Sequence, residues 1–350
     1  MAYTDIDKPS DYFNTVLYTG NGSTQSITGV GFQPDWVWMK QRNAAQSHVL
    51  IDSVRGVLKR LRSDQSDAED TKANSLTAFG TDGFTLGSAY EVNDSSDTYV
   101  AWNWKAGTSF TNDASGTGIG SIDSAGSASD TSGFSIVSYS GTGSAGTIKH
   151  GLSTAPSMII VKVRTGRTSD WLVYHKGVAS DAQTDFLKLN ETNAVADEAT
   201  IWNDTAPTSS VFSVGTEDTV SGSGNTFIAY CFADVQGYSK FGSYTGNGNV
   251  DGPFFYTGFK PAFVMIKASS RTGDWVMYDN KRSVFNIVTK RLNANLNSAE
   301  DTDNFLDFCS NGIKIRNTYG SHNTSGETYI YMAFAENPFV TSTAIPATAR

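Results

Sequence analysis

The chain has 350 residues, of which 39% are hydrophobic and 12% aromatic, so it is long enough for two or three domains and is not disordered. Its formal net charge of -9 argues against nucleic acid as a main partner, because phosphate binding needs a concentrated positive surface. The start lacks a secretory signal and no window of about 18 apolar residues exists, so we expect a protein made in a cytoplasm that does not insert into a membrane.

The first predicted unit, residues 1–106, consists of short strands separated by turn residues. It opens with YTGNG at 18–22, where Asn-Gly is a hairpin-turn signal. The run GFQPDWVWMK at 31–40 is apolar on both faces and predicts a central strand covered on both sides. HVLIDS and LTAFGTDGFTLG follow, and SDTYVAWNWKAG at 96–107 closes the unit. The best helical candidate is 53–63, which contains a glycine.

The rest of the chain repeats this unit twice. A Gly-, Ser- and Asp-rich segment, 107–132, is interpreted as a partly ordered linker with one possible strand around 119–122. The second unit, 133–236, and the third, 237–340, follow, and they are joined by a short connection. The last ten residues, 341–350, are expected to form a flexible tail.

Matched spacing makes the repeat secure. Successive copies are 121 and 105 residues apart at the opening tyrosine, and 122 and 105 apart at the proline of the central strand (Tyr18, Tyr139 and Tyr244; Pro34, Pro156 and Pro261). Short aromatic strands between turn residues are typical of sandwiches and jelly rolls. We therefore predict an all-β fold with three tandem β-sandwich, jelly-roll-like modules of about 90–100 residues.

No catalytic or phosphate-binding motif is found in the sequence. The four histidines have no second His or Cys at ligand spacing and are expected to be satisfied or solvent-facing (His48, His150, His175 and His322). Cys231 and Cys309 lie in apolar runs, which favours two buried small side chains over a disulfide. We predict no catalytic residue, no metal site and no cofactor, and hence no enzyme.

Three acidic segments at corresponding places are the main site candidates, with carboxylates at Asp67–Asp70, Asp197–Glu198 and Glu300–Asp303. Paired carboxylates can bind calcium or act as acid and base in a glycosidase. Solvated loops, or loops that cap a short helix, are favoured, and calcium or a subunit contact stays open. For a hydrolase, Asp67, Glu69 and Asp70 would be the candidates.

Two other repeated residue types have a structural interpretation. Each central strand ends in a lysine that we expect to reach toward solvent or a carboxylate (Lys40, Lys162 and Lys267). Several tryptophans could stack on sugars, but two of them occupy the same place in two units, which favours core packing (Trp36, Trp38, Trp171, Trp202 and Trp275).

Four phrases carry a family resemblance: GFQPDWVWMK, DSVRG at 52–56, DGFTLG at 82–87 and GFSIVSYSGTG at 133–143. They resemble a domain of unknown function that recurs in virion proteins of tailed, mostly marine, phages. The second and third units lack DSVRG and the WNWKAG ending. The resemblance implies a virion structural or appendage protein, often a tail fibre or adhesion protein, and brings no catalytic residues.

Three functions follow as hypotheses. The leading one is a protein exposed on the phage virion, a tail fibre or receptor-binding appendage that contacts host surface glycan. Its partners would be other virion proteins, host carbohydrate and further copies of the chain, with a trimer as one candidate. The alternative is a capsid decoration protein on the head, favoured by the lack of an obvious amino-terminal adaptor or long fibrous repeat. A polysaccharide-degrading enzyme is the third.

Overall fold

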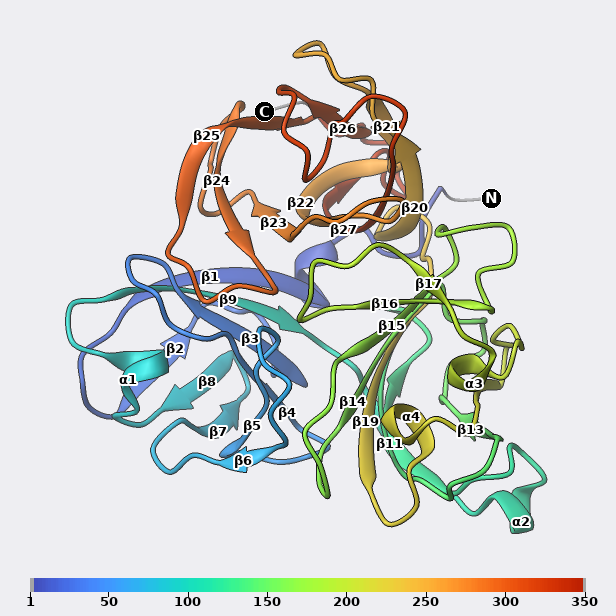
Figure 1. The fold of residues 1–350 in the computed structure, drawn as a ribbon. Coiled ribbons are helices and arrows are strands. Elements are labelled where there is room, and N and C mark those ends of the chain that lie inside the picture. The colour runs from blue at the N-terminus through green and yellow to red at the C-terminus, as the bar shows by residue number, and fades with distance from the viewer. Residues whose placement is uncertain (1–2, 349–350) are drawn as a thin grey trace.

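Three β-sandwich modules surround a common centre in the computed structural model, which describes residues 3–348 (Figure 1). Module 1 is blue to cyan, module 2 green to yellow and module 3 gold to red. The predicted all-β class of β-sandwich modules is confirmed. No helix among the described residues is long and apolar enough to cross a membrane.

Module 1 has a four-stranded antiparallel sheet, in the order β1-β9-β3-β4, covered on one face by the sheet β2-β8-β7. A short ribbon of β5 and β6 follows β4. Its elements are η1 (Pro9–Asp11), β1 (Phe13–Thr19), β2 (Gln25–Thr28), β3 (Trp36–Gln41), β4 (Val49–Asp52), β5 (Lys59–Arg60), β6 (Asp70–Thr71), β7 (Leu76–Gly80), β8 (Gly83–Leu86), α1 (Tyr90–Asn93) and β9 (Thr98–Trp104).

Module 2 has an eight-stranded sheet, in the order β10-β11-β12-β19-β14-β15-β16-β17, and a second layer made by β13 and β18. Its elements are β10 (Thr108–Asn112), α2 (Ala114–Thr117), β11 (Ser124–Ser129), β12 (Phe134–Ser140), β13 (Gly146–Lys149), β14 (Met158–Val163), β15 (Leu172–His175), β16 (Asp185–Lys188), β17 (Ala196–Asp197), α3 (Ala199–Trp202), β18 (Val211–Val214), α4 (Asp218–Ser221) and β19 (Thr226–Phe232).

Module 3 is one continuous sheet, β20-β27-β22-β23-β24-β25-β26-β21, whose second half folds back over the first and encloses a core of its own. Its elements are β20 (Ser239–Thr245), β21 (Phe254–Tyr256), β22 (Phe259–Ala268), β23 (Trp275–Asp279), β24 (Val288–Asn293), β25 (Asp301–Phe308), β26 (Gly312–Ile315) and β27 (Thr328–Pro338).

The same four-strand order recurs in every module, since β1-β9-β3-β4 corresponds to β12-β19-β14-β15 and to β20-β27-β22-β23. In each case the closing strand lies between the opening strand and the central strand. The repeated sequence phrases therefore form repeated hydrogen-bonded units, and the equivalence of positions can be read from the strand register.

The central strands are buried on both faces, as their sequences predict. Because side chains alternate along a strand, Trp36 and Trp38 of β3 point to one core while Val37 and Met39 point to another. The strands β14 and β22 divide their side chains in the same way. One core lies inside each sandwich, and the fourth core is shared by all three modules.

Aromatic contacts across module boundaries hold this shared core together. Trp36 stacks on Tyr230 of module 2 at a centroid distance of 4.3 Å, and Phe13 stacks on Phe334 of module 3 at 5.0 Å. Phe232 of module 2 lies 6.1 Å from Phe334. Every pair of modules is therefore in contact, and the repeat forms a closed ring in place of a string of separate units.

The segment 107–132 differs from its predicted linker role. It forms β10 and β11, which extend the sheet of module 2 beside β12, and the helical turn α2. The possible strand around 119–122 is reduced to an isolated bridge between Ile122 and Ile148. Pairing with the open edge of β12 outweighs the weak strand propensity of SAGSAS in β11.

The predicted helix at 53–63 and the tail also differ from expectation. Arg55 turns inward to Asp52, and Gly56 at φ +91° ends any helical path, so the segment forms a turn followed by β5. In the tail, Ser342 N donates to Asp7 Oδ1 at 2.6 Å, and Val340 pairs with Pro346. Positions 349 and 350 lie outside the described residues.

Candidate functional site

The acidic segments of modules 1 and 3, and Val195 just before the acidic pair of module 2, lie at boundaries between two modules. The backbone N–H of Glu69 donates to Arg164 O at 2.8 Å, and that of Glu300 donates to Arg42 O at 2.7 Å. At the third boundary Val195 N donates to Ser269 O at 2.8 Å. All three acceptors lie two residues after the repeated lysine, so the contacts are equivalent. They run from module 1 to 2, from 2 to 3 and from 3 to 1.

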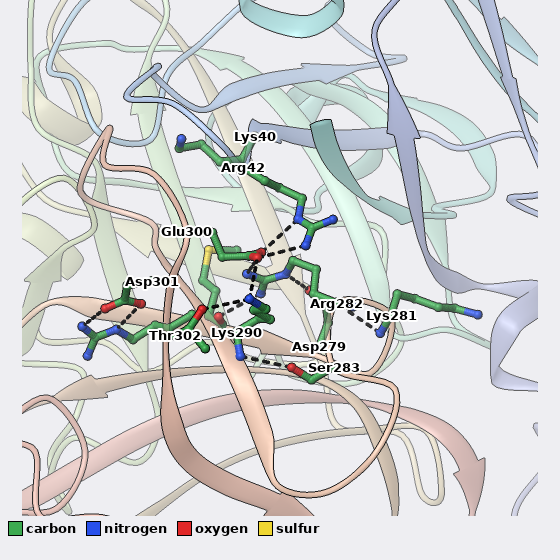
Figure 2. Close-up of polar contacts among 12 residues, drawn as sticks. Lys40, Arg42, Asp279, Lys281, Arg282, Ser283, Lys290, Glu300, Asp301 and Thr302 are labelled. Carbon is green, nitrogen blue, oxygen red and sulfur yellow. Dashed lines mark hydrogen bonds and ion pairs between the residues drawn. The ribbon is translucent and has the colours of Figure 1, made fainter. Parts of the chain in front are cut away.

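The boundary between modules 3 and 1 contains a chain of ion pairs (Figure 2). Arg42 donates two hydrogen bonds to the Glu300 carboxylate, from Nε at 3.0 Å and from Nη2 at 2.9 Å. Arg282 approaches the same carboxylate from the other side, with Nη1 at 3.3 Å, while its Nε donates to Asp279 Oδ2 at 2.5 Å. Asp279 and Arg282 have no exposed side-chain surface, and Glu300 is 8% exposed.

A tryptophan of module 1 completes this boundary. Trp102 Nε1 donates to Asp279 Oδ2 at 3.1 Å, and the Arg282 guanidinium lies 5.4 Å from the centre of a Trp102 ring. The closing strand of module 1 thus supplies both a hydrogen bond and a cation–π contact to the buried ion pair of module 3.

The boundary between modules 1 and 2 repeats the arrangement. Arg55 Nε donates to Asp52 Oδ2 at 2.5 Å and its Nη1 to Glu69 at 3.2 Å, and Arg164 of module 2 binds Glu69 at 3.0 Å. Tyr230 of module 2 donates to Asp52 at 2.7 Å. Burial opposes the charge of Arg55, but its anionic partners outweigh burial and raise its pKa.

The boundary between modules 2 and 3 uses apolar residues at the same positions. The register pairs Met158 with His175 as it pairs Trp36 with Asp52 and Phe263 with Asp279, so His175 replaces the aspartate. Three residues later Val178 replaces the arginine, and Val195 replaces the glutamate. Both valines pack against the shared core.

His175 is buried, and its Nε2 lies 3.0 Å from Tyr331 O of module 3. Burial lowers its pKa to about 4, which favours the neutral imidazole at this boundary. One of the three equivalent contacts therefore has no ion pair at these positions and has the same backbone hydrogen bond as the other two.

A family model matches residues 8–338, which is nearly the whole ring. The chain belongs to the family described as Domain of unknown function (DUF7483). No curated protein and no solved structure matches it. In this family member, the segment DSVRG contributes Asp52 and Arg55 to the buried ion pair at a contact between modules.

A second set of equivalent donors joins the modules of this family member. Trp171 Nε1 donates to Arg62 O at 2.8 Å and Trp275 Nε1 to Lys188 O at 2.9 Å. In module 1 the position before the equivalent strand is His48, whose Nε2 lies 3.0 Å from Asn293 O. All five tryptophans considered as sugar platforms are buried in cores (Trp36, Trp38, Trp171, Trp202 and Trp275).

The repeated lysines are buried, which corrects the expectation that they reach toward solvent or a carboxylate. Lys162 Nζ donates to Ser169 O at 2.7 Å and to Ser66 O of module 1 at 3.1 Å. Lys267 Nζ donates to Ala268 O at 2.6 Å and to Thr192 O of module 2 at 3.3 Å. Lys40 also donates to carbonyls. Burial lowers the pKa of each amine to about 8.

The other carboxylates of the acidic segments serve local contacts. Asp67 and Asp70 bind Arg62, and Asp301 binds Arg291. Glu198 caps α3 by accepting from Thr200, and its neighbour Asp197 pairs with Asp185 in the sheet. The acidic pair of module 2 thus lies beyond the boundary position, which Val195 fills.

No group of three or more His, Cys, Asp or Glu side chains within residues 3–348 is placed to hold a metal ion. The four histidines are buried, with lowered pKa values caused by burial, and each ring contacts a hydrogen-bonding partner. Cys231 is buried and Cys309 partly buried, and both are free thiols.

Sequence reasoning missed the arginine partners of the acidic segments. Arg42 and Arg164 stand two residues after the repeated lysine, while Arg55 and Arg282 stand three residues after an aspartate. These two repeated spacings were the signal in the sequence that could have identified the arginines. The repeated charged groups hold modules together, so the site that they form is an assembly site within the chain.

Proposed function

We propose that this protein is a structural component of a phage virion, exposed on the particle. One observation carries the proposal: the charged residues repeated between modules are used in buried contacts between modules. Repeated polar groups that are buried in contacts between modules are typical of a structural protein. The family resemblance of its phrases to virion proteins supports the same function.

Within the virion, a tail fibre or receptor-binding appendage that contacts host surface glycan is the leading assignment. The protein would then bind other virion proteins on one side and carbohydrate on another, and act as a homo-oligomer for which a trimer is one candidate. Several copies on one particle would raise the overall avidity for a repetitive polysaccharide.

A capsid decoration protein is the second candidate. Among residues 3–348 the chain forms a closed ring without an extended shaft, which suits a protein lying flat on a shell (Figure 1). Seven of the ten large apolar side chains exposed on the described surface lie in module 3 and none in module 2. A contiguous exposed apolar patch is typical of a surface that contacts another protein, and module 3 has most of the side chains from which one would be built.

The location of the protein on intact particles tests these assignments. Cryo-electron microscopy with gold-labelled antibody should place it on the tail for an appendage or on the head for a decoration protein. Its absence from purified particles would refute both. For adhesion, purified protein should bind host cells and their polysaccharide. Release of reducing ends from that polysaccharide would instead indicate a hydrolase and contradict the non-catalytic role.

A further inference from the structure

The insertion that distinguishes module 2 borders two adjoining hollows of about 430 Å³ and 530 Å³. The first runs along β10 and the end of β11 and is lined by Phe110 and Lys149. The second lies against the arm Tyr3–Asp5. Asp130 and Thr131 line both hollows, which are called the groove below. The volume of each hollow falls in the range of small-molecule sites, about 300–1,000 Å³.

Phe110 provides the apolar surface of this groove. Its ring rests on two glycines: a Cβ added at Gly151 would lie 2.6 Å from Phe110 Cε1, and one added at Gly126 would lie 3.0 Å from the same atom. Gly151 also has φ +80°, which favours glycine. Lys149 Nζ lies 5.9 Å from the ring centre. The ring packs closely against the two glycines and is half-buried.

Polar groups line the remainder of the groove. Asp130 Oδ1 accepts from Ser153 N at 2.6 Å, which fixes the side chain, and within residues 3–348 its Oδ2 has no hydrogen-bond partner. Lys149 forms no ion pair within the same described range. Thr131 and Asp5 add a hydroxyl and a second carboxylate.

We infer that this groove binds an uncharged oligosaccharide. A sugar ring offers an apolar C–H face to the Phe110 ring and hydroxyls to Asp130, Thr131 and Lys149, which is the mixture of one aromatic surface and a few polar groups that ligand sites use. Two carboxylates against one amine, on a chain of net charge -9, disfavour a polyanionic chain.

This inference rests on the proposed adhesion function, because the groove would supply the contact with host glycan. It also predicts the number of binding sites per chain. Within the described residues 3–348, modules 1 and 3 have no counterpart of the β10–β11 insertion. One chain should therefore bind one oligosaccharide, although its sandwich fold is present three times.

The test is isothermal titration of the full-length protein with neutral hexasaccharides (maltohexaose, laminarihexaose and cellohexaose), with neutral oligosaccharides cut from the host polysaccharide, and with an alginate hexauronate. We expect at least one neutral probe to bind with about one site per chain. Phe110→Ala should weaken that binding about tenfold, which corresponds to the loss of about 1.4 kcal/mol. Asp130→Asn keeps the acceptor for Ser153 and should also weaken it. Tyr90→Ala, an exposed aromatic in module 1, is the matched control.

The outcomes separate the groove from the wider function. If the wild-type protein and Phe110→Ala bind host cells equally, the groove assignment is overturned while adhesion survives. The groove assignment is also overturned if no neutral probe binds. Three sites per chain, or tighter binding of the hexauronate, also overturn it. If host cells bind neither wild type nor any variant, adhesion itself fails. Circular dichroism melts of every variant, together with Asp130→Asn as the second variant, keep a folding defect of Phe110→Ala from deciding the result.

Discussion

Replacing Arg282 with valine should strongly destabilise the ring, because it leaves Asp279 and Glu300 as buried anions without their shared cation. Arg282 has no exposed side-chain surface and donates to Asp279, to Glu300 and to Met277 O. Removing one partner of a buried pair costs about 3–5 kcal/mol. With an unfolding entropy of about 2.1 cal/mol/K per residue, 350 residues give about 0.7 kcal/mol/K, so a loss of about 4 kcal/mol lowers Tm by about 5 °C.

The boundary between modules 2 and 3 supplies the matched rescue. There His175, Val178 and Val195 of module 2 and Ser269 of module 3 fill the positions of Asp279, Arg282, Glu300 and Arg42. The fourfold variant Asp279→His, Arg282→Val, Glu300→Val and Arg42→Ser removes these four charged groups together and should recover most of the lost stability, since apolar replacements of buried ion networks are often neutral.

Urea and thermal unfolding, followed by circular dichroism, measure both variants. Lys8→Met, which removes an exposed pair with Asp11, is the surface control and should change stability by less than about 1 kcal/mol. The reasoning fails if Arg282→Val is as stable as Lys8→Met, or if the fourfold variant is no more stable than the single one.

Three further predictions concern titration. Burial lowers the pKa of Lys40, Lys162 and Lys267 to about 8, so the unfolded chain binds more protons than the folded one between about pH 8 and 10, and the free energy of unfolding should rise across that window. Urea midpoints at about pH 7.5 and 9.5 measure the rise, which should be smaller in Lys162→Met; an equal rise would contradict the assignment. Burial likewise lowers the pKa of His48 and His322 to about 3 and of His150 and His175 to about 4. The free energy of unfolding should therefore fall as the pH drops from about 6.5 to 4, and it should fall less in His150→Gln. An equal fall in that variant would contradict the lowered pKa of His150. Burial raises the pKa of the Cys231 thiol to about 12, so a thiol reagent at about pH 8 should label native protein at Cys309 alone and both thiols in denaturant; native labelling of Cys231 would disprove its burial.

The sequence predicted the strands well, because their signal is local. Apolar residues on both faces of WVWM, MIIV and FVMI required cover on two sides, and the repeat spacing gave the number of modules. What covered the second face was not predictable. Whether Trp36 meets Tyr230 of another module or a partner protein depends on how modules dock, and three linked sandwiches show the same periodicity whether they are separate or closed.

The candidate site was harder to predict because its partners lie far apart in sequence. Glu300 was singled out as an acidic residue, but Arg42 is 258 positions away and carries no local sign of the pairing. The buried lysines were misjudged for a related reason: a lysine at a strand end usually reaches water, but the neighbouring module covers Lys162 and Lys267 and adds a second carbonyl acceptor to each.

The replacement of ions by His175, Val178 and Val195 at one boundary has a genetic consequence. In a homotrimer of a single module, symmetry would place every substitution at all three interfaces at once, so its effect on stability would be tripled. Covalent fusion removes that restriction, since every copy occupies its own codons. One copy can then exchange its interface for an apolar one, and the same copy can accept the β10–β11 insertion, while its neighbours preserve the closure of the ring.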